Sequence, residues 1–474
     1  MDDEIAVTED EGGWSELPDL LIESIYSYLN MRDRYNCSMV CKRWYDAFYL
    51  PQSWSVFVFD ERTLTRRRFN YYSGWQYTLD HLRAQMCLST VGSFFRVLIF
   101  APMTNFYNMY EFMNMLSFYA EHHNAKEKCT VSGIGEHIHT LRYQFPCDLL
   151  ARFEEDQISR LYGTGGKLLE AVKRLMGNLK KLRHLELTDL LLDGTEAKTL
   201  LDDVATEQCL ILRTLSIVNM TKSTCPIIHP GVFINLQTEQ VLEMSPQNLS
   251  EELVSLLADS GLPTLHLRQT EHSPPSPPPI SPKAWSQATA RNPRLRVHLS
   301  LTSLRVEREI VWQERAPVAS ILYDCPFSKL EAELLNRTLE WYRETLQLFG
   351  HVGLPRFTTP KSFIDRTDPF LLMMVKECPR LNTLILRERV STCTLLLIAE
   401  AGRNRLKDFY VRRNAVIMRF DWPISPEWSE EYQQWLKKCS QSYEATESAI
   451  SDILGKSWTM LSDKEFVKLW PKMY

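Results

Sequence analysis

A short apolar motif that recurs along the chain places the strongest limit on its fold. In each copy an aliphatic residue is followed three positions later by an apolar pair with one residue between its members. Such a pair fits a short strand with one buried face, and the leading residue anchors the entry to that strand. The five clearest copies are Leu182, Leu185 and Leu187; Leu212, Leu215 and Ile217; Leu262, Leu265 and Leu267; Leu381, Leu384 and Leu386; and Leu406, Phe409 and Val411.

Helical patterns fill the intervals between copies, at residues 168–176, 251–258, 370–376 and 394–400. The spacing is irregular, with 30 residues from Leu185 to Leu215 and 25 from Leu384 to Phe409. A repeated unit of strand, turn, helix and turn resembles a leucine-rich repeat. We therefore predict an α/β solenoid with parallel strands on its concave face and helices outside.

A conventional α/β domain with a parallel sheet uses the same local pattern and is the alternative. Its central strands lie between two helix layers and read as continuous runs of valine and isoleucine. The sequence has no long run of that kind, and the anchoring aliphatic residue recurs instead. Both observations favour the solenoid.

A second apolar pattern lies near the N-terminus, between residues 17 and 44, where apolar side chains recur at helical three- and four-residue steps. We expect one helix to begin after Ser15 and end near Asn30, a second to begin at Asp33, and a third to contain Trp44. Chains below about 40 residues rarely form a sufficient core of their own. The three helices are therefore expected to bury apolar surface against a partner.

This segment resembles the F-box. The F-box pattern begins with Leu-Pro, an acidic residue and two aliphatics, continues with two further aliphatics and an Asp-Arg pair, and ends in Val-Cys-Lys-x-Trp. The matching residues are Leu17, Pro18, Asp19, Leu20, Leu21, Ile25, Leu29, Asp33, Arg34, Val40, Cys41, Lys42 and Trp44. The resemblance implies docking on a Skp-type adaptor, which sits on a cullin scaffold that carries a RING ubiquitin ligase.

The resemblance also implies which side chains bind the adaptor. These interface candidates are Leu17, Pro18, Leu20, Leu21, Ile25, Leu29, Val40, Cys41 and Trp44. The alternative is an ordinary three-helix subdomain that packs on its own chain. The many positions that match in order favour the adaptor-binding module.

We predict four parts along the chain. They are an acidic disordered tail at residues 1–13, the F-box at 14–50, the repeat solenoid at 51–420 and a C-terminal aromatic and helical cap at 421–474. Solenoids need an atypical terminal unit to cover their last open core, and an aromatic cluster at Trp422, Trp428, Tyr432 and Trp435 fits that role. An alternating aromatic run at residues 54–59 is expected to pack the F-box against the first repeat.

A proline-rich loop at residues 271–283 interrupts the solenoid, because prolines cannot take part in a strand ladder. Ser273, Ser276 and Ser281 each precede a proline. This arrangement suits proline-directed phosphorylation or capture by a proline-binding domain, with an inert surface loop as the alternative.

Composition excludes several classes of protein. The formal net charge of -5 gives no overall attraction to nucleic acid or to membranes. The 11 cysteines show no paired spacing, the first 13 residues carry six acids and no lysine or arginine, and no apolar run approaches the length of a membrane span. Reduced thiols in the cytoplasm and/or nucleus are expected.

Motifs for enzymatic chemistry or metal binding are weak. The glycine-rich segment 163–167 lacks the spacing of a phosphate-binding loop, and Lys167 has no Ser or Thr after it. His137 and His139 could share one face of a strand, but two ligands without a second cluster do not predict a metal site. We expect no cofactor, no metal and no catalytic residues, and we interpret the Arg66–Arg68 run as a solvated loop.

The residues that flank the strand leucines are expected to face the concave surface and to bind a target. The candidates are His266, Arg268, Arg296, His298, Arg387, Tyr410 and Arg412. Arginine forks match the oxygens of carboxylates and phosphates. A basic concave surface would therefore prefer acidic or phosphorylated partners.

The function predicted from these features is that of a substrate-recognition subunit of a Skp–cullin–F-box ubiquitin ligase, which would promote ubiquitination and degradation of an unknown target protein. Two alternatives stay open. One is an F-box protein that acts as a scaffold without degrading anything. The other is an enzyme in the C-terminal half, such as a hydrolase on an α/β frame.

Overall fold

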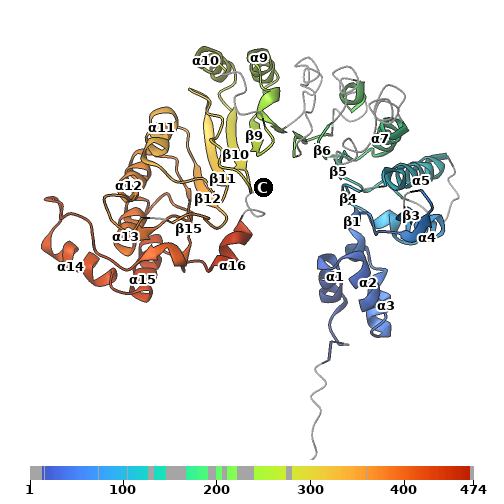
Figure 1. Cartoon of the computed structure of the whole chain (residues 1–474), viewed down its shortest axis with the longest axis horizontal. Coiled ribbons are helices and arrows are strands. Elements are labelled where there is room, and N and C mark those ends of the chain that lie inside the picture. The colour runs from blue at the N-terminus through green and yellow to red at the C-terminus, as the bar shows by residue number, and fades with distance from the viewer. Residues whose placement is uncertain are drawn as a thin grey trace, which may run out of the picture. The chain divides into compact units, whose positions relative to one another are not determined.

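The structure is a computed structural model that describes residues 13–14, 16–72, 74–103, 105–125, 133–145, 167–190, 199–204, 211–220, 240–273, 280–358 and 360–469. The acidic tail up to residue 12, residues 163–166 of the glycine-rich segment and residues 274–279 of the proline-rich loop lie outside this part. Contacts divide the chain into a first unit, Met1–Ile217 with Ser223–Ile228, and a second unit, Val218–Lys222 with His229–Tyr474. Each unit is described by itself (Figure 1).

The first unit begins with three short helices, α1 (Asp19–Tyr28), α2 (Met31–Ser38) and α3 (Lys42–Phe48), followed by the 3-10 turn η1 (Pro51–Trp54). Pro18 occupies the N-cap position of α1, where its missing N–H costs nothing. The side chain of Asn30 accepts a hydrogen bond from the Asp33 backbone N–H at 3.0 Å. Asn30 therefore starts α2, and the prediction that Asp33 caps this helix is wrong.

Five parallel strands follow in the first unit: β1 (Val56–Phe59), β4 (Val97–Phe100), β5 (Thr140–Gln144), β6 (His184–Thr188) and β7 (Thr214–Val218). Chain order and spatial order agree along this sheet. The connections contain α4 (His81–Val91), η2 (Gly92–Phe94), α5 (Phe106–Ala125) and α7 (Lys167–Asn178). Stacked rings fill the core beneath the first strands, with centroids 4.3 Å apart for Phe57 and Phe95 and for Phe59 and Phe112.

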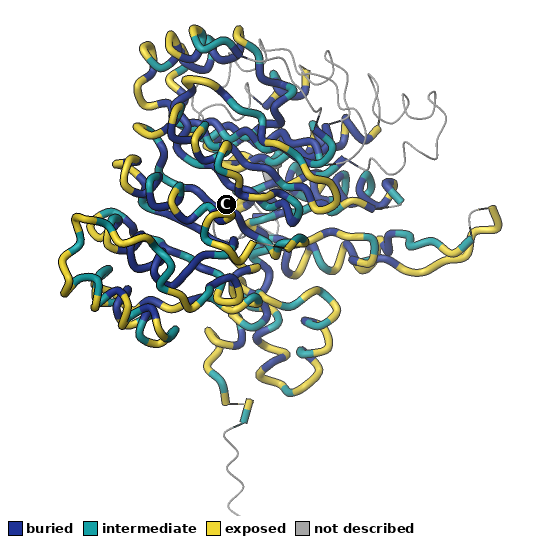
Figure 2. The backbone as a smooth tube through the Cα atoms, turned by 60° about the vertical axis from the view of Figure 1, so that its left-hand side comes forward, coloured by how far each residue is buried: buried dark blue, intermediate teal, exposed yellow. Residues whose placement is uncertain are grey.

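An antiparallel hairpin is inserted between β1 and α4. Its strands are β2 (Thr65–Asn70) and β3 (Gly74–Leu79), paired from Thr65 and Leu79 to Asn70 and Gly74. Most of its residues are exposed (Figure 2). Arg66–Arg68 lie in β2, so the interpretation of this run as a loop is wrong. Neither face of the hairpin carries a regular buried set, which is the signal that would have predicted a strand.

The second unit contains seven parallel strands in chain order: β8 (Val241–Met244), β9 (Thr264–Thr270), β10 (Arg296–Thr302), β11 (Val318–Asp324), β12 (Leu348–Val352), β13 (Thr383–Leu386) and β15 (Asp408–Val411). Between them lie η5 (Pro246–Asn248), α9 (Glu251–Asp259), α10 (Pro282–Arg291), α11 (Ala332–Tyr342), α12 (Asp368–Glu377) and α13 (Thr392–Ala401). A small second sheet pairs β14 (Val390–Ser391) with β16 (Val416–Ile417), and η6 (Arg413–Ala415) lies between β15 and β16.

The repeated apolar motif explains this architecture. Leu265 pairs in register with Val297, and Leu267 with Leu299, so equivalent apolar residues form rows across the strands. These four side chains are all buried beneath the helices. The predicted α/β class, with parallel strands and a layer of helices after an N-terminal helical module, is confirmed. We call the strand face opposite the helices the open face.

The C-terminal part of the second unit adds α14 (Glu430–Cys439) and α15 (Tyr443–Leu454), which pack against α13. The chain then returns to the strands through α16 (Asp463–Phe466) and η7 (Val467–Leu469). Phe466 and Leu469 are buried against Leu322, Val352 and Ile385 on the open face. Figure 1 shows α16 beside the strand side of the second unit, apart from the helices α14 and α15.

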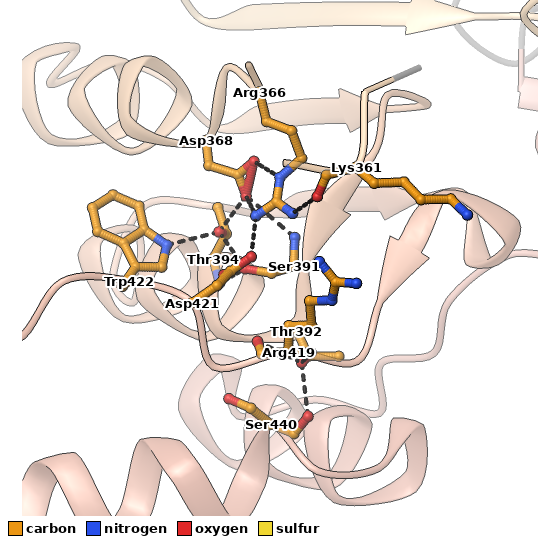
Figure 3. Close-up of polar contacts among 10 residues, drawn as sticks. All are labelled: Lys361, Arg366, Asp368, Ser391, Thr392, Thr394, Arg419, Asp421, Trp422 and Ser440. Carbon is orange, nitrogen blue, oxygen red and sulfur yellow. Dashed lines mark hydrogen bonds and ion pairs between the residues drawn. The ribbon is translucent and has the colours of Figure 1, made fainter. Parts of the chain in front are cut away.

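A buried polar cluster fastens this C-terminal part to the repeats (Figure 3). Arg366 donates to Asp368 Oδ1 at 2.7 Å and to Asp421 Oδ2 at 2.6 Å. The Trp422 indole N–H donates to Thr394 Oγ1 at 2.8 Å, and Thr394 donates in turn to Asp368. Because Arg366 and Asp368 are fully buried, loss of either partner would leave an uncompensated charge.

Candidate functional site

The three N-terminal helices have a core of their own. Ile22 and Tyr26 of α1 pack against Trp44 and Ala47 of α3, and all four are buried. Tyr26 Oη donates to the Trp44 carbonyl at 2.8 Å, and burial raises the pKa of Tyr26 above its usual range. This core uses one face of α1 and leaves another face to solvent.

Arg34 ties the helical module to the first strand. Its Nε donates to the carbonyls of Tyr26 at 3.0 Å and Leu29 at 2.9 Å, which satisfies the C-terminal end of α1. The guanidinium lies 5.6 Å from the ring centroid of Trp54. Trp54 is buried and donates from its indole to the Phe48 carbonyl. Arg34 Nη1 also donates to the Val56 carbonyl at 3.5 Å, so these contacts join the module to the start of β1, in the segment where the sequence predicts a packed joint.

Apolar side chains are exposed on the solvent side of α1 and in the turn before α3. Leu20, Leu21 and Val40 are 75%, 52% and 69% exposed. Tyr28, the last residue of α1, and Met39, in the turn before α3, are 90% and 62% exposed. An apolar patch of this kind on a small module is typical of a protein-binding surface.

A groove of about 1200 Å³ lies between this module and α4. Its lining includes Tyr35, Asn36, Tyr49, Trp54, Met86 and Cys87. Burial raises the pKa of the Cys87 thiol to about 12. Cys87 is therefore protonated at neutral pH and behaves as an apolar wall of the groove rather than as a nucleophile.

On the second unit, the side chains of β8, β9 and β10 that alternate with the buried apolar residues lie side by side. The rings of His266 and His298 stack with centroids 4.4 Å apart, and His298 Nδ1 lies 2.7 Å from Ser320 Oγ. Burial lowers the pKa of His266 to about 4; burial, followed by the charges of His266 and Arg296, lowers that of His298 to about 3. Both imidazoles are neutral at pH 7, so they add no positive charge to this surface.

The two arginines of this region differ in their partners, because Arg268 has an acidic partner whereas Arg296 is hydrogen-bonded to carbonyls. Arg268 pairs with Glu243 at 3.4 Å, and Arg296 donates to the carbonyls of Pro293 at 2.9 Å and Leu295 at 2.7 Å. The structure thus places His266, Arg268, Arg296 and His298 next to one another, but as a mixed polar surface rather than a cationic one.

Arg387 does not reach a surface. Its side chain is fully buried and donates to the carbonyls of Val352 at 3.0 Å and Ser328, and to Glu388 Oε1 at 3.2 Å. The prediction that Arg387 forms part of an exposed binding face is therefore corrected: the carbonyl of Val352, at the end of β12, and that of Ser328, in the loop after β11, enclose its guanidinium. The strand pattern alone carries no signal for this enclosure.

Tyr410 and Arg412 belong to the attachment of the C-terminal segment. Arg412 donates to Asp463 Oδ1 at 2.7 Å, which lowers the pKa of that carboxyl. Tyr410 packs against the buried cluster around Phe466 and donates to Asp408 Oδ1 at 3.2 Å. These two residues contact the chain itself at positions where a target was expected.

The comparisons with known proteins bear on the N-terminal module. The family model of the F-box domain matches residues 14–56, which include α1, α2, α3 and the joint at Trp54. Residues 14–56 therefore form an F-box domain. It is similar to F-box/LRR-repeat protein 21 of Ovis aries, with 33% identity over 57 residues, and to the proteins of the same name of Bos taurus, with 35% over 57 residues, and Mus musculus, with 40% over 47 residues. The matches span 12%, 12% and 10% of this chain and only 13%, 13% and 11% of those relatives.

The F-box candidates fall into three groups. Pro18, Leu20, Leu21 and Val40 are exposed. Leu17, Ile25, Leu29 and Cys41 are partly buried and pack against the F-box core, and Trp44 belongs to that core. Sequence reasoning missed Tyr28 and Met39 as exposed apolar residues, although their helical spacing from Leu21 and Tyr35 could have indicated them.

The hydroxyl groups of two of the three serines in the proline-rich loop accept hydrogen bonds from the backbone. Ser273 is 1% exposed and its Oγ accepts from the Thr270 backbone N–H at 2.9 Å. Ser281 caps α10 by accepting from the Ala284 backbone N–H at 3.2 Å. Ser276 lies outside the described residues.

In the residues that the structure describes, no group of three or more His, Cys, Asp or Glu could hold a metal ion. His139 Nδ1 lies 2.9 Å from Thr140 Oγ1, and the exposed His137 lies at a small pocket beside it. Within the same described ranges, no helix has the length and apolar character needed to cross a membrane.

Proposed function

We propose that this F-box protein is a substrate-recognition subunit of a Skp–cullin–F-box ubiquitin ligase. Its F-box binds the Skp-type adaptor and, through it, the cullin and RING subunits. Its strand-and-helix repeats hold a target protein whose ubiquitination and degradation follow. The chain itself supplies no catalytic residue, and it acts in the cytoplasm and/or nucleus.

The observation that carries this proposal is the exposed apolar patch on a helical module whose core is already complete. Leu20, Leu21 and Val40 remain at solvent although Ile22 and Trp44 are buried. A partner that covers them would gain binding free energy, because removal of apolar surface from water is favourable. The adaptor is the partner implied by the F-box match.

The mechanism is proximity. The adaptor fixes one end of the chain to the ligase, and the repeats raise the effective concentration of the target near the ubiquitin-charged enzyme. The link between F-box and repeats must then be ordered, and the contacts of Arg34 and Trp54 support this. A flexible glycine- and serine-rich linker would lower the effective concentration.

Calorimetric titration of purified Skp-type adaptor into the full chain tests the proposal. Leu20→Ala with Leu21→Ala should weaken binding by at least about tenfold, because central apolar residues of an interface carry most of its energy. The two side chains are exposed, so the variant should keep the thermal stability of the wild type.

A matched control is Phe69→Ala with Trp75→Ala, which removes two exposed apolar side chains from the β2–β3 hairpin of the same unit. This control should bind the adaptor like the wild type. Unchanged adaptor affinity in the Leu20 and Leu21 variant would contradict the proposal.

The degradative step needs its own test, since a scaffold F-box protein would pass the first one. Target ubiquitination should be compared in cells with and without the protein, through the ubiquitin remnants on co-purified partners. Remnants that fall on removal of the protein support a degradative receptor. Remnants that stay constant while adaptor binding persists support the scaffold.

A further inference from the structure

Four basic residues occupy one equivalent position in successive repeats of the first unit. Arg96, His139, Arg183 and Arg213 each stand immediately before a strand, β4, β5, β6 and β7 respectively. Backbone hydrogen bonds join them in a row: Arg213 N to the Arg183 carbonyl at 2.8 Å, Arg183 N to the His139 carbonyl at 2.8 Å, and His139 N to the Arg96 carbonyl at 2.9 Å. Neighbouring strands lie ~4.8 Å apart, so the row is about 14 Å long. We call it the basic row.

A small pocket opens along the basic row. Its volume is about 200 Å³, and Arg96, His137, His139, Lys181 and Arg183 line it. Arg96, Arg183 and Arg213 are exposed, and His139 is half-buried. Every lining side chain therefore carries a cation or an imidazole.

Of the cations that line this pocket, only Lys181 has an acidic partner in the described ranges. Arg96, Arg183 and Arg213 form no ion pair with any residue in the described ranges, and Lys181 has Glu136 at 3.6 Å. By contrast Arg142, two residues into β5, pairs with Glu186 at 3.1 Å. Burial, and then the charges of Arg183 and Arg96, lower the pKa of His139, which is consistent with an uncompensated positive field.

The fold does not require a cation at this position. In the second unit the corresponding backbone bonds run from Gln347 N to the Ala319 carbonyl at 2.7 Å and from Asn382 N to the Gln347 carbonyl at 2.9 Å. Pro263 accepts in the same way from Arg296 N at 2.8 Å. Alanine, glutamine, asparagine and proline occupy this position there, Lys407 occupies it before β15, and Ser55 occupies it before β1 in the first unit. Strand formation therefore does not account for the four consecutive basic residues from β4 to β7.

We propose that the basic row binds a phosphorylated segment of the target protein, an inference that rests on the proposed role as a substrate receptor. Guanidinium groups contact phosphate oxygens two at a time, with more charge per contact than a carboxylate offers. An extended peptide advances ~3.3 Å per residue, so about four residues lie along the row. One or two phosphates fit within that length.

The test uses the full chain and a labelled peptide of alternating glycine and alanine that carries two phosphoserines two residues apart. Fluorescence anisotropy should give an affinity at least about tenfold above that of the same peptide without phosphate. Arg96→Gln with Arg183→Gln should remove about tenfold or more, and added salt should weaken wild-type binding. Arg67→Gln with Arg68→Gln changes the net charge equally on the exposed hairpin and should leave binding unchanged.

Equal affinity of the two double variants for the phosphopeptide would overturn the proposal, as would equal binding of the two peptides by the wild type. A third peptide carries glutamates in place of the phosphoserines. If it binds as tightly as the phosphopeptide, the basic row recognises clustered carboxylates rather than phosphate, which would contradict the proposal. Tighter binding of an oligodeoxythymidylate of equal charge would also contradict it. Adaptor binding measured on the same samples separates the two proposals. Adaptor binding without phosphopeptide binding would contradict the phosphopeptide site alone. Phosphopeptide binding without adaptor binding would contradict the receptor role alone.

Discussion

His266 and His298 show how single residues in a repeat can carry the pH dependence of a whole unit. Their rings stack between β9 and β10, and both have pKa values lowered below that of a free histidine. Unfolding releases them to an ordinary pKa near ~6.5. The unfolded chain then binds more protons than the folded chain whenever the pH lies below about 6.5.

The free energy of unfolding is therefore expected to be constant above about pH 6.5 and to fall as the pH drops from there towards 4. The limiting slope is about 1.4 kcal/mol per pH unit for each histidine. Urea titrations at pH 7 and pH 5 should show a smaller loss for His298→Gln than for the wild type, because glutamine can keep a hydrogen bond to Ser320 without titrating. An equal loss in both proteins would rule out this role for His298.

At the scale of elements, the C-terminal segment α16–η7 is the least expected feature. Phe466 and Leu469 cover Leu322, Val352 and Ile385 on the open face, while Arg412 and Asn414 hold Asp463 at 2.7 and 3.0 Å. Part of the strand surface on which a target was expected is thus covered by the chain itself. The polar surface of β8–β10 and the basic row before the first-unit strands are left for partners.

Replacement of Phe466 tests this attachment. Phe466→Ala removes a fully buried ring and should cost the segment about 3 kcal/mol or more, so that residues 461–469 exchange amide hydrogens faster. Val467 is the matched control, since it is the adjacent residue and is 49% exposed. Val467→Ala should change exchange little. Identical exchange in the two variants would show that Phe466 does not hold the segment in place.

The elements also show what sequence reasoning could predict. Strands β6, β7, β9, β13 and β15 followed from the leucine motif, because each apolar pair is buried beneath helices. The hairpin β2–β3 was missed, since its arginines and aromatic residues are exposed on both faces and give no period of two. The position of α16 was missed because Phe466 and Leu469 read as an ordinary helix face, and the surface they cover comes from distant strands.

The candidate site divides in the same way. The F-box pattern predicted Leu20, Leu21 and Val40 as interface residues, and these side chains are exposed. The prediction was possible because the matching residues lie in order within one short segment. The predicted cationic open face is not what the structure shows, and single strands carry no signal for this difference. Arg387 and Arg412 are compensated by groups that tertiary structure brings to them, namely the carbonyls around β12 and the carboxylate of Asp463.

At the scale of the whole molecule, the account joins an attachment module to a repeat receptor. The exposed apolar residues of the F-box are the surface that we propose binds the ligase adaptor, and the repeats offer two further surfaces of different charge. The basic row lies at the start of the first-unit strands and carries net positive charge, whereas the surface around His266 is mixed, with a neutral imidazole and an arginine paired with Glu243. Different parts of one target could therefore be bound by surfaces of different chemistry.

The most direct test of the central claim is affinity purification of the full chain from cells, followed by mass spectrometry. The wild type should recover a Skp-type adaptor, a cullin and a RING subunit together with target proteins. Leu20→Ala with Leu21→Ala should lose the three ligase subunits and keep the targets, because the repeats are unchanged. Equal recovery of adaptor and cullin by wild type and variant would contradict the account.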